Sequence, residues 1–118
     1  MTLLTAASGP LMAQTDETAR TMVRRVLTKL VGGQVYRLRI TPVMWDVDGG
    51  PRMVHSILLL DGLGRELPTP RGGHMAIVGV LRLAFPTQWF DMACEYDVPS
   101  GGLHRYDPPV PSFLREAS

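Results

Sequence analysis

The strongest constraint on this chain is one amphipathic helix followed by about ninety residues in which Gly and Pro separate short apolar segments. Between residues 19 and 30, apolar side chains recur at the i, i+3, i+4, i+7 spacing of a single helical face. Thr15 offers an N-cap hydroxyl, two acidic residues follow it, and Gly32 suits the C-terminal stop. We therefore expect a helix over residues 15–31.

The remainder is typical of antiparallel strands. Residues 34–46 are rich in β-formers, and Tyr36, Leu38 and Ile40 fall on the more apolar parity, which we expect to face the core. Residues 46–51 predict a turn, and residues 52–60 predict a strand that returns antiparallel. The apolar run 74–85 is compatible with strand or helix; its β-branched residues and Gly79 favour strand.

These elements predict an α+β fold, in which one N-terminal amphipathic helix packs on a curved, mainly antiparallel β-sheet. A small β-sandwich or barrel with an appended helix is the alternative. The length of 118 residues fits one domain. We expect a flexible lead-in over 1–14, a globular domain over 15–106 and a Pro-rich extended tail over 107–118.

Composition limits the environment of the protein. The chain is 45% hydrophobic and 19% charged with a net charge of +1, which is typical of a globular protein rather than a disordered one. Cys94 is the single cysteine, so an intrachain disulfide and a multi-cysteine zinc site are excluded, and we expect it to be a small buried side chain. Lacking a basic leader and a long apolar run, the chain is predicted to be cytoplasmic, without a membrane span.

The basic residues also indicate an origin. Lys29 is the only lysine and asparagine is absent. Both amino acids use AT-rich codons, so we infer a GC-rich genome of a bacterium or its phage.

The residues with catalytic potential are few and scattered. Histidine titrates nearest to neutral pH, and with carboxylates it can build an acid–base pair or a metal site. None of the histidines has an HxH, HxxE or HExxH spacing, so we predict no metal and no cofactor. The candidates are His55, His74, His104, Asp61, Glu95 and Asp97.

Residues 99–104, Pro-Ser-Gly-Gly-Leu-His, have the pattern P-x-G-x-x-H. This pattern is similar to part of the second conserved motif of the cupins, where the resemblance implies a metal-binding histidine at the mouth of a β-barrel. The paired histidines of the first cupin motif are absent here, Ala93 replaces a leading glycine, and Pro108 replaces an asparagine. The sequence therefore does not assign the chain to this family.

The polar side of the predicted helix is basic, through Arg20, Arg24, Arg25 and Lys29. These side chains could contact phosphates, which makes a weak nucleic-acid binder one hypothesis. The net charge of +1 and the lack of interleaved aromatics favour a solvated face instead.

Large apolar residues provide the last candidates. They are Trp45, Trp89 and Phe90 together with Met44, Met53, Met75 and Met92. We expect most of them in the core; any on an open sheet face would form a partner-binding surface. The leading hypothesis is a small non-catalytic binding or adaptor protein whose partner is another protein or a second copy in a homodimer. The alternative is a ligand-binding protein or enzyme with a histidine-lined pocket for a small molecule at one end of the sheet.

Overall fold

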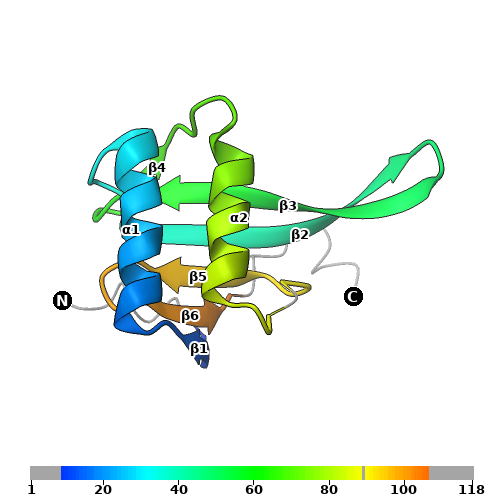
Figure 1. Cartoon of the computed structure of the whole chain (residues 1–118). Coiled ribbons are helices and arrows are strands. Elements are labelled where there is room, and N and C mark those ends of the chain that lie inside the picture. The colour runs from blue at the N-terminus through cyan, green and yellow to red at the C-terminus, as the bar shows by residue number, and fades with distance from the viewer. Residues whose placement is uncertain (1–8, 89, 107–118) are drawn as a thin grey trace, which may run out of the picture.

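The computed structural model describes residues 9–88 and 90–106. This part of the chain contains two helices and six strands (Figure 1). In order they are β1 (Leu11–Gln14), α1 (Glu17–Val31), β2 (Arg37–Val47), β3 (Gly50–Leu60), β4 (Glu66–Leu67), α2 (Gly73–Ala84), β5 (Cys94–Asp97) and β6 (Gly102–Arg105).

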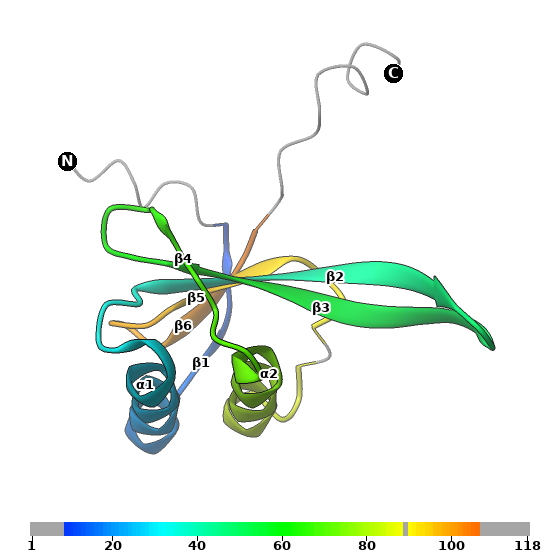
Figure 2. The ribbon, with the colours of Figure 1, turned by 90° about the horizontal axis from the view of Figure 1, so that it is seen from above.

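The strands form one sheet in the order β1-β6-β5-β2-β3-β4, and every neighbouring pair is antiparallel. Both helices lie on the same face of this sheet (Figure 2). The predicted α+β class is therefore confirmed, and the alternative of a sandwich or barrel is wrong, because the described strands make a single sheet whose edges are β1 and β4.

The prediction that the helix comes first is wrong, because β1 precedes it. Residues Leu11–Gln14, which we expected in a flexible lead-in, pair with β6. A four-residue edge strand is too short for its alternation to be distinguished from a coil segment in sequence. Residues 1–8 of the predicted lead-in and the whole predicted tail 107–118 lie outside the described residues.

Helix α1 agrees with the amphipathic pattern, and its buried side chains Val23 and Leu27 lie one turn apart. Its N-cap is Asp16, whose carboxylate accepts a hydrogen bond from the Ala19 backbone N–H at 2.7 Å. Thr15, the predicted cap, is buried, and its hydroxyl donates instead to the Gly101 carbonyl at 2.8 Å. The start of α1 is thereby attached to the turn between β5 and β6.

Helix α2 (Gly73–Ala84) covers nearly all of the segment 74–85, for which composition favoured a strand, so that preference was wrong. Gly73, Ile77, Val80 and Leu81 are buried at the i, i+4, i+7, i+8 spacing of a helical face. Burial of this face in the core shared with α1 and the sheet outweighs the weak β-propensity of its branched residues.

The helix-covered face of the sheet forms the core. Leu38 and Ile40 of β2 are buried there as predicted, and Tyr96 and Leu103 of the neighbouring strands lie beside them. Tyr36, expected on the same face, lies just before β2 and is exposed, so that part of the prediction was wrong.

The β2–β3 hairpin continues beyond the rest of the sheet. The two strands pair from Arg37 and Leu60 to Val47 and Gly50, but β5 pairs with β2 only as far as Ile40. Residues 42–55, here called the arm, form a two-stranded ribbon that projects past α2 (Figures 1 and 2). Six residues per strand correspond to about 20 Å.

We expect Gly101→Ala to destabilise the protein more than Gly64→Ala. Both glycines have positive φ, 76° and 81°, which costs an alanine about 1 kcal/mol. An alanine Cβ at 101 would lie 2.2 Å from the Thr15 hydroxyl oxygen, whereas nothing lies within 4 Å at 64. Urea unfolding of both variants measures the difference, and equal losses would show that the Thr15–Gly101 contact does not constrain this turn.

Candidate functional site

The arm exposes large apolar side chains on both of its faces. Met44 and Trp45 are 63% and 58% exposed. Val43, Val47, Met53 and Val54 are exposed as well. A free two-stranded ribbon is at best marginally stable in water, and exposed apolar patches commonly mark contact surfaces. The arm is therefore the candidate functional site.

The register assigns each side chain to a face, because directly paired residues of antiparallel strands point the same way. The face that continues the helix-covered side holds Pro42, Met44, Asp46, Pro51, Met53 and His55. The opposite face holds Val43, Trp45, Val47, Arg52 and Val54. One proline in each strand removes a backbone donor, which disfavours addition of another strand along the arm. The two faces, rather than the edges, are thus the available surfaces.

Among the predicted partner-binding residues, Trp45 is on the arm, Phe90 is buried, and Trp89 lies outside the described residues. Our expectation that most methionines would be in the core was wrong for Met44, Met53, Met75 and Met92, all of which are exposed. Within residues 42–47 and 50–55, apolar side chains fall on both parities of the strand pattern, and this could have shown a ribbon that is apolar on both faces. It could not show that the helix layer ends before this ribbon does.

Two of the candidate histidines lie where the arm joins the domain. The His55 ring donates through Nε2 to the Phe90 carbonyl at 2.8 Å, and its edge packs against the Phe90 ring. The His74 ring, in the first turn of α2, donates to the His55 carbonyl. Phe90 has a φ of 54°, the single positive value among the described non-glycine residues. These contacts position α2 and the Phe90 segment beside the arm.

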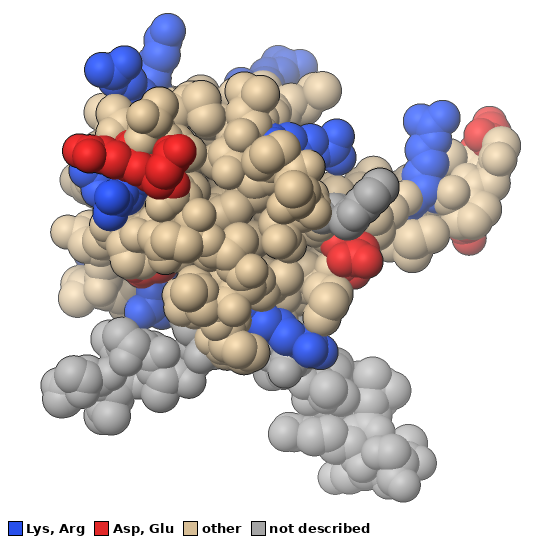
Figure 3. Space-filling view, turned by 60° about the horizontal axis from the view of Figure 1, so that its bottom comes forward, with Lys and Arg blue, Asp and Glu red and all other residues tan. Residues whose placement is uncertain are grey.

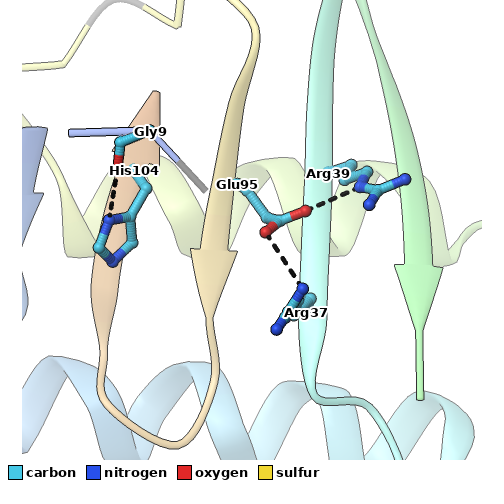
Figure 4. Close-up of polar contacts among 5 residues, drawn as sticks. All are labelled: Gly9, Arg37, Arg39, Glu95 and His104. Carbon is cyan, nitrogen blue, oxygen red and sulfur yellow. Dashed lines mark hydrogen bonds and ion pairs between the residues drawn. The ribbon is translucent and has the colours of Figure 1, made fainter. Parts of the chain in front are cut away.

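The third histidine and Glu95 lie on the helix-free face (Figure 4). Glu95 is 1% exposed, and its carboxylate accepts a hydrogen bond from Arg39 Nε at 2.7 Å. Arg37 Nη1 lies 3.7 Å from the other carboxylate oxygen. His104 is the strand partner of Glu95, but its Nδ1 contacts the Gly9 carbonyl at 3.2 Å. Glu95 is therefore engaged by arginines, and it forms an ion pair that holds β5 to β2.

The other two candidate carboxylates meet at the end of the sheet opposite the arm. Asp61 and Asp97 line a hollow of about 100 Å³ together with Tyr36 and Arg37. Hydrogen bonds from the Arg65 and Leu63 backbone N–H groups, the Arg65 bond being the stronger influence, hold the pKa of Asp61 below its usual range. No histidine lines this hollow, so the structure does not bring the histidines and these carboxylates together there.

Metal binding and thiol chemistry receive no support from the described residues. Within residues 9–88 and 90–106, no group of three His, Cys, Asp or Glu side chains is placed to hold a metal ion. Cys94 is fully buried, and burial raises the pKa of its thiol to about 12. A thiol with this pKa stays protonated at neutral pH and is a poor nucleophile.

The predicted basic face of α1 is exposed at Arg24, Arg25 and Lys29, whereas Arg20 is half-buried and reaches the Ser100 carbonyl. On the side of the molecule that Figure 3 shows, Lys and Arg side chains are dispersed around the surface rather than gathered in one patch. Together with the net charge of +1, this distribution gives no support to a phosphate-binding surface on the side shown.

We expect Arg39→Leu to lower the free energy of unfolding by about 3 kcal/mol, because it removes the nearer cation from a buried carboxylate. Arg37→Leu is the matched control; its longer ion pair should cost less than about 1 kcal/mol. Combining Arg39→Leu with Glu95→Leu should restore much of the loss. Urea titrations of the four proteins test this, and equal losses from Arg37 and Arg39 would contradict it.

We also expect stability to fall with pH above 9 through Cys94. Its pKa is about 12 in the folded protein and 9.0 in the unfolded reference, so only the unfolded chain loses the proton between these values. The free energy of unfolding then falls by up to about 1.4 kcal/mol per pH unit from this group. Burial also raises the pKa of Tyr96, which acts in the same direction. Cys94→Ala retains the Tyr96 contribution; parallel pH curves for the two proteins would contradict the assignment.

Comparison with known proteins identifies no family for this chain. No protein family model, no curated protein and no solved structure matches the chain. Among the described residues, neither helix has the length and apolar character needed to cross a membrane.

Proposed function

We propose that this chain is a protein–protein interaction module and that the arm is its contact surface. The observation that supports this function best is the exposure of Val43, Met44, Trp45, Met53 and Val54 on a ribbon that projects from the domain. Interface centres are enriched in Trp and Met, and buried aromatic residues provide much of the binding energy there.

The geometry of the arm supports a pre-formed contact. Its strands remain paired to the Asp48–Gly49 turn, where Gly49 has a φ of 103° that favours glycine. At its base, His55 and Phe90 join it to the folded domain. A surface already held in its binding conformation loses less conformational entropy on association.

The competing hypotheses have weaker support. A histidine-lined pocket requires His55, His74 and His104 at one site. His74 lies in α2 and contacts His55 of β3, whereas His104 contacts Gly9 on the helix-free face. Nucleic-acid binding through α1 requires a concentrated basic surface, whereas the chain has a net charge of only +1 and the Lys and Arg side chains on the side that Figure 3 shows are not gathered in one patch.

A photoreactive amino acid placed at the arm tests this function. We expect the replacement of Met44 or Trp45 by p-benzoylphenylalanine to give a covalent protein adduct when the cells that produce the variant are irradiated. The two positions are chosen because they lie on opposite faces of the arm. Leu63 is the matched control, since it is an exposed apolar residue in the turn between β3 and β4. The absence of adducts from both arm positions, or equal adducts from position 63, would overturn the proposal.

A further inference from the structure

We propose that the partner is a second copy of this chain, and that the helix-side face of each arm packs on the exposed face of α2 in the other copy. This inference rests on the proposed function of the arm. It is supported by two exposed apolar surfaces whose charges are complementary.

The first surface is the helix-side face of the arm. Along β2 and β3 this face is covered by helices at Leu38, Ile40 and Ile57, which are buried. Farther along this face, Met44 and Met53 lie beyond α2 and are exposed. An apolar sheet face is buried against a second layer, and within this domain that layer is made of helices, so a helix fits the uncovered part of the face.

The second surface is the exposed side of α2. Met75 and Leu83 are 81% and 70% exposed, although they belong to a helix of the core. Gly79 lies between them on this side, and a Cβ built there would meet nothing within 4 Å. Glycine inside a helix costs about 1 kcal/mol relative to alanine. Nothing in the described chain requires it, whereas it would allow another backbone to approach closely.

Charge distinguishes these surfaces from ordinary apolar patches. Asp46 shares the helix-side face of the arm with Met44 and Met53. Helix α2 contains no Asp or Glu, and Arg82 lies two turns from Met75 on its exposed side. Arg52, the cation of the arm, points from the opposite face beside Trp45. The acidic apolar face of the arm thus matches the basic apolar face of α2.

A two-fold arrangement satisfies both surfaces at once. The arm projects from beside α2 (Figures 1 and 2). The His74 ring joins the two by its hydrogen bond to the His55 carbonyl. In this arrangement a two-fold axis turns the second copy upside down relative to the first, so that the helices of both copies lie in one layer. Each α2 is then covered by its own sheet on one side and by the partner's arm on the other. Each contact would occur twice, so the buried area would be double that of one arm on one helix, as expected for an isologous interface.

Native mass spectrometry and sedimentation of the untagged full chain test this arrangement. We expect a species of twice 13.0 kDa. Met53→Asp, on the helix-side face, should raise the dimer dissociation constant on the order of 100-fold by placing an unpaired carboxylate in the contact. Val54→Asp, on the opposite face of the same strand, is the matched control and should leave the dimer intact.

Three further single variants and one double variant address α2 and the charge pairing. Gly79→Ala should favour the helix of the monomer, yet weaken the dimer. Asp46→Arg and Arg82→Asp should each weaken the dimer, and their combination should restore it. A 13.0 kDa monomer at about 100 μM, or a dimer that responds to Val54→Asp but not to Met53→Asp, would overturn the inference. A monomer whose arm still cross-links to another polypeptide would leave the proposed function standing, whereas a monomer without arm adducts would overturn both.

Discussion

The limited width of the helix layer determines the rest of this structure. Helices α1 and α2 cross the strands side by side (Figure 1), and at about 10 Å per helix they cover roughly 20 Å of strand length. Strands of eleven residues, such as β2 and β3, extend about 36 Å. The excess cannot be buried by the chain's own helices, so it projects as the arm with both apolar faces in solvent.

The opposite face of the sheet is stabilised differently. No described helix covers it, and its centre holds the buried carboxylate of Glu95 between Arg39 and Arg37. The Arg39 guanidinium also lies over the Tyr106 ring, 4.7 Å from its centroid, which adds a cation–π contact. A buried carboxylate needs such compensation, so this face depends on paired charges where the other depends on apolar packing.

Local sequence patterns predicted the elements whose signal lies in neighbouring residues. The spacing of Val23 and Leu27 located α1, and the Asp48–Gly49 turn located the hairpin. The same reasoning favoured a strand over 74–85 because of its β-branched side chains and Gly79, whereas Ile77 and Val80 are buried on one face of α2. Strand β1 was also missed, since its partner β6 lies some ninety residues later in the chain.

The sequence by itself determined the fold class, the long hairpin, and the single cysteine as a small buried side chain. Each of these follows from periodicity and turn chemistry, which depend on a few neighbouring residues, or from composition, which is a property of the whole chain. Only the tertiary structure decided that Met44 and Trp45 are exposed while Phe90 is buried, although all three are large, mainly apolar side chains. Burial depends on which strands extend beyond the helix layer. The length of a strand and the width of the helix layer can be compared only when distant segments of the chain are packed together.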